Sequence, residues 1–205
     1  MGSPNTPIGN QVKHLLIILS ILLLSSPLFG QSNTKQWTKQ LGTSSPEYGN
    51  GVTTDSSGNI YVTGYTQGGL DGNTNSGNSD IFLVKYNSSG TKQWTKQLGT
   101  SYWDYGNSVT TDSSDNIYVN VVTSGDLDGN TSSGFSDIFL VKYNSSGTKQ
   151  WTKQLGTSDN DSGLGVTTDS SGNVYVTFQS LGGTDIFLVK YDSSGTKQWT
   201  KQLGT

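Results

Sequence analysis

The side chains that could do chemistry in this sequence are mainly acidic and aromatic. Glu47, Asp104 and Asp161 occur at 57-residue intervals, each in a short segment rich in polar residues. Two carboxylates that face each other are the catalytic pair of most glycoside hydrolases, so these three are candidates for such a role. A carboxylate in a tight turn also commonly accepts hydrogen bonds from its own backbone, and we favour that interpretation for all three.

An aromatic cluster surrounds the second of these acids, in the segment 101–105 with the sequence SYWDY. Such clusters can stack on sugars or bind a protein partner, whereas packing inside the fold is the alternative. The equivalent segment 158–162, with the sequence SDNDS, is polar. The candidate residues for contacting a ligand or partner are Glu47, Tyr102, Trp103, Asp104, Tyr105, Asp159 and Asp161.

Oxygen donors alternate along a glycine-containing segment, which is the spacing of a calcium-binding loop. The donors are Asp71, Asn73, Asn75 and Asp80 in one copy and Asp128, Asn130 and Asp137 in a second. The final bidentate Glu of such loops is missing from both copies, and the donor pattern is less complete in the second. Structural calcium is therefore the one cofactor that the sequence suggests, and a metal-free polar turn is the interpretation we favour.

Missing residue types exclude several classes of chemistry. Beyond residue 30 the sequence contains no His, Cys or Arg, and its only Glu is Glu47. A Ser/His/Asp or Cys/His nucleophile system, a His/Cys zinc site and a guanidinium grip on phosphate cannot be built from these residues. The 12 basic residues, including Lys13, are outnumbered by 15 acidic ones, which argues against nucleic-acid binding. We therefore expect a protein that is not an enzyme.

The first 30 residues have the order of a secretory signal. Lys13 and His14 precede the apolar run 15–24, and small residues follow up to Gly30. The run is short for a membrane span, so we expect cleavage after Gly30 and no stable span afterwards, with an uncleaved anchor as the alternative. The predicted location is periplasmic, outer-surface or secreted. The absence of cysteine excludes a lipid-modified N-terminal Cys.

Internal repeats organise the remainder, 31–205. The stretch SSGTKQWTKQLGT occurs at 88–100, 145–157 and 193–205, and part of it occurs at 34–43. Trp37, Trp94 and Trp151 are 57 residues apart, and Trp199 follows after 48. The shorter last interval reflects a nine-residue deletion in the third unit.

Each unit predicts four strands, because short runs of aromatic and β-branched residues alternate with turn signals. In the third strand, at 80–86, 137–143 and from Asp185, both faces are apolar, which predicts a sheet covered on both sides. The first strands are expected at 51–54, 108–111 and 165–168, and the second at 60–66, 117–123 and 174–178. The repeated KQWTKQL motif predicts a fourth strand at the blade edge, where Lys discourages edge-to-edge pairing.

Three motifs carry a family resemblance: DSSGNIYVTG at 55–64, SDIFLVKYNSSG at 79–90 and KQWTKQLGT at 92–100. They resemble the bacterial β-propeller repeat family abbreviated SBBP. The resemblance implies an all-β fold of propeller-type blades, each with four antiparallel strands. It implies no activity, because propellers host binding, scaffolding and several unrelated enzymes.

The predicted organisation is a lone outer strand at 34–43 followed by three full blades at 44–100, 101–157 and 158–205. Closed propellers have four to eight blades, so we expect an incomplete propeller that is a shortened version of a longer chain. Self-association into a ring and an open stack of three blades are the alternatives.

Three functions remain open from the sequence. The leading hypothesis is a non-enzymatic, exported or surface-associated scaffold for binding or adhesion, with an unknown protein or glycan as its partner. The second is a carbohydrate-active propeller enzyme that uses the loop carboxylates. The third is a structural module that self-assembles through open blade faces.

Overall fold

A computed structural model describes residues 36–183 and 185–204. The predicted signal at 1–30 lies outside the described residues and remains a prediction. The chain divides into two units at Gln36/Trp37, and every described strand lies in the second unit, Trp37–Thr205. In the described part of the chain, no helix combines the length and apolar character needed to cross a membrane.

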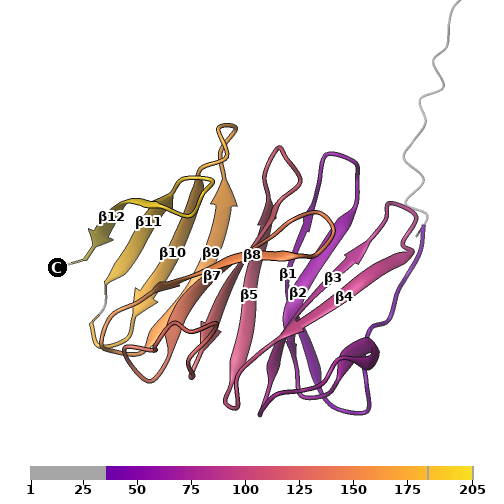
Figure 1. Ribbon diagram of the computed structural model, residues 1–205, viewed down its shortest axis with the longest axis horizontal. Coiled ribbons are helices and arrows are strands. Elements are labelled where there is room, and N and C mark those ends of the chain that lie inside the picture. Colours follow the sequence, from indigo (N-terminus) through magenta and orange to yellow (C-terminus); the bar gives the residue numbers. More distant parts are fainter. Residues whose placement is uncertain (1–35, 184, 205) are drawn as a thin grey trace, which may run out of the picture. The chain divides into compact units, whose positions relative to one another are not determined.

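Three antiparallel four-stranded sheets make up the second unit, which confirms the predicted all-β blades (Figure 1). In each sheet the spatial order follows the chain order, as in a meander. Blade 1 contains β1 (Glu47–Thr54), β2 (Ile60–Thr66), β3 (Asp80–Tyr86) and β4 (Lys92–Leu98), with a short 3-10 helix, η1, at Leu70–Gly72. Blade 2 contains β5 (Asp104–Thr111), β6 (Ile117–Thr123), β7 (Asp137–Tyr143) and β8 (Lys149–Leu155). Blade 3 contains β9 (Asp161–Thr168), β10 (Val174–Ser180), β11 (Ile186–Tyr191) and β12 (Lys197–Leu203).

Two sequence predictions need correction. The first strands begin at Glu47, Asp104 and Asp161, several residues before the predicted starts, because a bulge lets the Gly-rich segment continue pairing with the second strand. The predicted lone strand at 34–43 is also wrong over its described part, since residues 36–43 form no strand. A strand needs a hydrogen-bonding neighbour, and none of the three described sheets includes residues 37–43.

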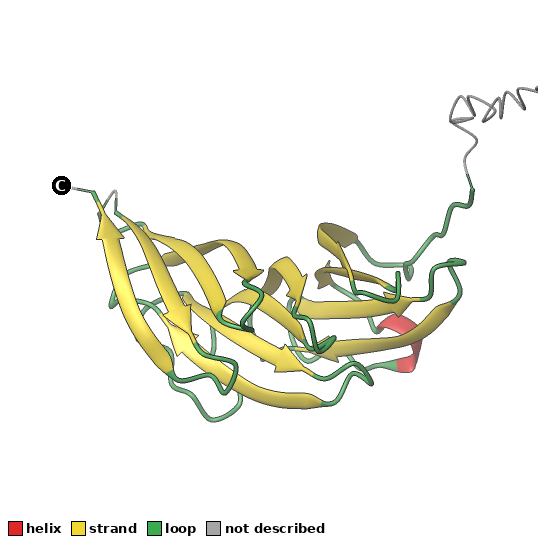
Figure 2. Ribbon diagram, turned by 90° about the horizontal axis from the view of Figure 1, so that it is seen from above, coloured by secondary structure: helices red, strands yellow, loops and turns green. Residues whose placement is uncertain are grey.

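Neighbouring blades meet along their first strands, as β1 contacts β5 and β5 contacts β9, while the fourth strands lie at the opposite sheet edges. Strands and their connecting loops make up nearly all of this unit, with one short helical turn (Figure 2). The side chain of Asn50 donates to the Gly106 carbonyl at 3.0 Å, and Asn107 repeats this bond to Gly163 at 3.0 Å. The hydroxyl of Thr111 donates across the same joint to the Thr54 carbonyl at 2.9 Å. The repeat therefore specifies the blade-to-blade joint as well as each blade.

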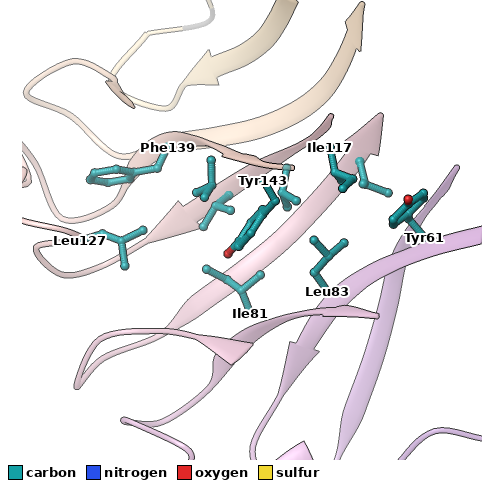
Figure 3. Packing of buried hydrophobic residues seen from close by; sticks show 11 residues of the cluster. Tyr61, Ile81, Leu83, Ile117, Leu127, Phe139 and Tyr143 are labelled. Atoms are coloured by element: carbon teal, nitrogen blue, oxygen red, sulfur yellow. The ribbon is translucent and has the colours of Figure 1, made fainter. Parts of the chain in front are cut away.

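The apolar core fills the spaces between the blades. Between blades 1 and 2, Ile81 and Leu83 of β3 pack with Phe139 and Tyr143 of β7, and Ile117 joins them (Figure 3). A second cluster joins blades 2 and 3. Six of the seven residues in β3 and in β7 are buried, which confirms for blades 1 and 2 that both faces of the third strand are covered. In blade 3 the prediction is wrong, because only two of the six residues of β11 are buried.

A polar and aromatic cluster repeats inside every blade, and we call it the Asp–Tyr–Trp cluster. In blade 1, Asp55 accepts hydrogen bonds from the backbone of Ser57 and Asn59 and from the hydroxyl of Tyr61, the last at 2.9 Å. The Tyr61 ring packs on Trp94 with centroids 6.0 Å apart. Burial alone would raise the pKa of Asp55, but hydrogen bonds, first that from the Asn59 side chain, outweigh burial and lower the pKa.

Blades 2 and 3 repeat this arrangement with Asp112, Tyr118 and Trp151 and with Asp169, Tyr175 and Trp199. The Trp of one blade also packs against the next blade: a Cβ built on Gly147 would lie 3.1 Å from the Trp94 ring, and one on Gly195 would lie 2.9 Å from Trp151. Trp37 has the same relation to Gly90, at 2.9 Å, although its segment forms no strand. Trp37, Trp94 and Trp151 therefore lie at positions of packing between one repeat and the next.

Candidate aromatic binding site

The rim where the first strands begin carries most of the sequence differences between the blades. One cross-strand pair stands at the same register in each blade, next to the acid that starts the first strand. It is Tyr48–Tyr65 in blade 1, Tyr105–Val122 in blade 2 and Ser162–Gln179 in blade 3. The rim is therefore aromatic in blade 1, mixed in blade 2 and polar in blade 3.

Four rings form a continuous row across the rims of blades 1 and 2, and we call them the aromatic array: Tyr48, Tyr65, Tyr105 and Trp103. Tyr48 stacks on Tyr65 with centroids 4.7 Å apart, and Tyr65 meets the edge of Tyr105, also at 4.7 Å. Trp103 stacks over Tyr105 at 6.3 Å. Tyr48 is 50% exposed and Trp103 42% exposed, so the row is open to a ligand at both ends.

The strands hold the array in place. Tyr48 and Tyr105 directly follow the acids that begin β1 and β5, and these two strands contact each other. The carbonyl of Trp103 accepts the Ser124 N–H at 3.0 Å, which fixes the loop that carries the indole. Burial raises the pKa of Tyr65 and of Tyr105, so both phenols stay neutral and can hydrogen-bond at physiological pH.

The three predicted rim acids are bound to their own turns. Asp104 accepts the Thr100 N–H at 2.6 Å, and Asp161 accepts that of Thr157 at 2.7 Å. Glu47 accepts the hydroxyls of Thr43, at 2.6 Å, and of Thr66, at 3.1 Å. Asp104 and Asp161 are buried, and burial raises the pKa of both carboxyls. These contacts match the turn-capping interpretation and direct the acids away from an open cleft.

The other predicted contact residues lie beside the array or apart from it. Tyr102 is exposed and packs near Gly125, outside the row of rings. Asp159 is exposed on the blade 3 rim, where its N–H donates to the Thr157 hydroxyl at 3.1 Å. Sequence reasoning did not select Tyr48 or Tyr65. Comparing equivalent positions of the three units would have found them, because the third unit has Ser162 and Gln179 there.

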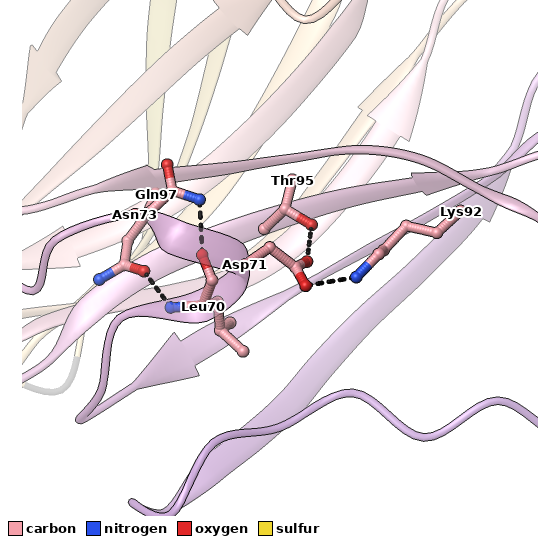
Figure 4. Close-up of polar contacts among 6 residues, drawn as sticks. All are labelled: Leu70, Asp71, Asn73, Lys92, Thr95 and Gln97. Carbon is pink, nitrogen blue, oxygen red and sulfur yellow. Dashed lines mark hydrogen bonds and ion pairs between the residues drawn. The ribbon is translucent and has the colours of Figure 1, made fainter.

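The donors of the predicted calcium loop have separate protein partners. Asp71 binds the ammonium of Lys92 and the hydroxyl of Thr95 (Figure 4). The side-chain amide of Asn73 donates to the Leu70 carbonyl at 2.7 Å, and that of Asn75 donates to the Gln67 carbonyl at 3.0 Å.

The second copy repeats this pattern. Asp128 binds Lys149 and Thr152, and Asn130 donates to the Leu127 carbonyl at 3.0 Å. Asp80 and Asp137 turn away toward other partners, described below. The structure therefore does not gather these donors around one point, and the described residues contain no cluster of three or more His, Cys, Asp or Glu side chains suited to a metal.

The comparisons with known proteins agree with the repeat architecture. Residues 36–71, 93–128 and 150–177 match a family model described as a beta-propeller repeat, SBBP. The chain is a beta-propeller repeat protein. This repeat protein is also 27% identical, over 183 residues, to an uncharacterized WD repeat-containing protein of Acanthamoeba polyphaga mimivirus. The match covers 69% of the chain and 13% of that relative, so the chain corresponds to a small part of the viral protein's length.

Proposed function

We propose that this beta-propeller repeat protein is a non-enzymatic, exported binding scaffold that holds a glycan against the aromatic array. The observation that carries the proposal is the row of four neighbouring rings on the rim of blades 1 and 2. Partly exposed rings outside the core mark interaction sites, because they offer a large contact area at a small entropic cost.

The chemistry of the rim favours a glycan. Sugar rings present apolar C–H faces that stack on aromatic side chains, and their hydroxyl groups need hydrogen-bonding neighbours. The segments around the array supply such groups, since 43–50 and 100–108 consist largely of Gly, Ser, Thr, Asn and acidic residues between the rings. A specific protein partner would instead need about 800 Å² of surface with an apolar centre.

The non-enzymatic part of the proposal is supported by the acids. Glu47, Asp104 and Asp161 are each bound to a Thr four residues earlier, which leaves them poorly placed to flank a glycosidic bond. A cavity of about 250 Å³ lies against blade 3 and is lined in part by Leu155, Phe178 and Phe187. None of its lining residues is Asp or Glu, so it supplies no catalytic carboxylate.

A polysaccharide panel tests the proposal directly. Full-length protein is incubated with insoluble and immobilised polysaccharides, and the bound fraction is compared for the wild type, Trp103→Ala and Phe135→Ala. Phe135 is 85% exposed and lies outside the array, so its substitution is the matched control. We expect Trp103→Ala to weaken binding at least tenfold and Phe135→Ala to leave it unchanged. Equal binding by all three proteins would refute the role of the array. Cell fractionation tests export separately.

Self-association through a blade face is the second candidate, and one contrast favours it. Ile81 is 3% exposed because it packs against Gly106 of the following blade, whereas the equivalent Ile186 of blade 3 is 42% exposed. A second copy of the chain could cover this face with its blade 1. Light scattering at micromolar concentration should then show a mass above that of the monomer, and Ile186→Lys should reduce it. A monomeric wild type would contradict this candidate.

A further inference from the structure

Two carboxylates from neighbouring blades approach each other at each blade joint. At the first joint the backbone N–H of Asp104 donates to the Ser79 carbonyl at 3.0 Å, which places Asp104 beside Asp80, the next residue of blade 1. At the second joint Asp161 makes the same bond to Ser136, beside Asp137, at 2.9 Å. Asp80, Asp104 and Asp137 are fully buried and Asp161 is 2% exposed.

Each of the carboxylates Asp80, Asp104 and Asp137 has one oxygen that is hydrogen-bonded and one that is not. Asp80 Oδ2 accepts the Ser76 N–H at 2.9 Å and the Gln97 side-chain amide at 3.0 Å, and Asp104 Oδ2 accepts the N–H and hydroxyl of Thr100. Asp137 Oδ2 repeats the Asp80 pattern with Ser133 and Gln154. The Oδ1 atoms of Asp80, Asp104 and Asp137 are buried and have no hydrogen-bond partner.

At the second joint, oxygens of both carboxylates lie beside a glycine, and one of them, Asp161 Oδ2, also accepts the Thr157 N–H. A Cβ built on Gly156 would lie 2.7 Å from Asp161 Oδ2 and 3.1 Å from Asp137 Oδ1, so oxygens from two blades flank the same point. Gly156 has a φ of 154°, in the region that favours glycine. At the first joint a Cβ on Gly99 would lie 2.2 Å from Asp80 Oδ1. Any larger residue at these positions would fill the space beside the carboxylates.

Among the residues that the structure describes, no basic side chain forms an ion pair with these buried carboxylates. The described ion pairs join Lys92 to Asp71 and Lys149 to Asp128, away from the joints. Paired carboxylates that are buried as ions without a counter-charge are strongly unfavourable, so a bound cation or a proton must neutralise them.

We propose that each joint binds a hard divalent cation, calcium, between its two carboxylates: Asp80 with Asp104 at the first joint and Asp137 with Asp161 at the second. Calcium prefers carboxylate, carbonyl and hydroxyl oxygens and tolerates irregular coordination. The bonds from Ser76, Gln97 and Thr100 orient the ligands, as outer-shell groups do at metal sites.

Blade 3 carries half of a third site. Asp185 accepts a hydrogen bond from the side-chain amide of Gln202, as Asp80 does from that of Gln97. Asp185 also lies beside Gly204. Among the described residues no acid of a following blade completes it. The expected stoichiometry is therefore two calcium ions per chain. These sites differ from the loop predicted from sequence, because they join two blades and do not use Asp71, Asn73 or Asn75.

Calcium titration of the metal-free full-length protein, followed by calorimetry and by thermal unfolding, tests the proposal. We expect two ions per chain for the wild type and a Tm increase on the order of 5 °C or more for each occupied site at saturation. Asp104→Asn should bind one ion, and Asp104→Asn with Asp161→Asn none. Asp71→Asn removes an exposed carboxylate away from the joints and should keep both ions.

The wild-type measurement decides the proposal even if a variant does not fold. A wild-type chain that binds no calcium and has the same Tm in EDTA and in calcium would overturn it, and the buried pairs would then share protons or bridging water. Equal losses of calcium in Asp104→Asn and Asp71→Asn would overturn it as well, because they would indicate nonspecific binding to surface acids.

Discussion

The rim and the interior of the blades differ in how strictly the sequence repeats. At the rim, one cross-strand pair changes from Tyr48–Tyr65 to Tyr105–Val122 to Ser162–Gln179. In the interior, the Asp–Tyr–Trp cluster keeps all three residue types, with ring centroids 6.0, 5.9 and 6.1 Å apart in the three blades. The interior holds the fold, and the rim can vary without disturbing it.

The physical basis of this difference is the number of bonds that each position makes. A rim ring contacts one or two other rings and solvent. By contrast, Asp112 accepts four hydrogen bonds, from the N–H groups of Ser114 and Asn116, the side-chain amide of Asn116 and the hydroxyl of Tyr118. Changing one member of such a network leaves several buried groups unsatisfied, so the whole set repeats together.

The largest effect should come from the apolar core between the blades. Phe139 is fully buried between blades 1 and 2, and Phe139→Ala should lower the free energy of unfolding by about 3–5 kcal/mol, because it removes buried surface and leaves a cavity. Urea denaturation followed by tryptophan fluorescence measures this loss. A loss below about 1 kcal/mol would mean that the blades do not share a core.

The next effect should come from the Asp–Tyr–Trp cluster. Asp112→Ala should cost about 1–3 kcal/mol, because the Tyr118 hydroxyl and the turn N–H groups lose their acceptor. Tyr118→Phe is the matched control, since it removes one of the four hydrogen bonds and leaves the carboxylate in place. It should cost less than Asp112→Ala in the same denaturation assay, and the reverse order would contradict the central role of the carboxylate.

Acid should act on the same cluster in all three blades. Hydrogen bonds, first that from the Asn173 side chain, lower the pKa of Asp169 from its ordinary 3.8 to about 2, and the pKa values of Asp55 and Asp112 are lowered too. A carboxyl whose pKa is lower in the folded state stabilises the fold above its unfolded pKa. This contribution should disappear as pH falls from about 4 to about 2. Circular dichroism at fixed urea checks it, and unchanged stability over that range would contradict it.

The smallest effect should come from rebuilding the rim. Ser162 and Gln179 face each other in blade 3 as Tyr48 and Tyr65 do in blade 1. Replacing both by Tyr should change stability by about 0.2–1 kcal/mol, in the stabilising direction, because an aromatic cross-strand pair replaces a polar one. Thermal unfolding measures it. A destabilisation above about 2 kcal/mol would show that the blade 3 rim is as constrained as the interior.

The sequence was sufficient to predict the blades because their signals are local and repeated. Alternating apolar runs located β2, β3 and β4 and their copies. The early start of β1 had no such signal, since the residues at 47–50 are Glu, Tyr, Gly and Asn and their pairing depends on a bulge. The strand predicted at 34–43 followed from similarity to β4, but the similarity carries no information about a pairing partner.

The sites were harder to predict because they depend on contacts between strands and blades. The spacing of Asp71, Asn73 and Asn75 suggested one metal loop, yet Lys92 and Thr95 reach Asp71 from β4. The aromatic cluster at 101–105 is visible in the sequence, so Trp103 and Tyr105 could be predicted as contact residues. Tyr65 was assigned to a strand, and the register that places it against Tyr48 was not visible in the spacing.

The separation of rim from interior is tested most directly by comparing two tryptophans. Trp103→Ala and Trp151→Ala remove the same side chain, from the array and from the Asp–Tyr–Trp cluster respectively. Polysaccharide binding and the free energy of unfolding are measured on both full-length proteins. We predict that Trp103→Ala loses binding and changes stability by less than about 0.5 kcal/mol, while Trp151→Ala loses about 2–3 kcal/mol and its folded fraction still binds. If both variants lost binding and stability in parallel, the proposed separation of the rim from the interior would be contradicted.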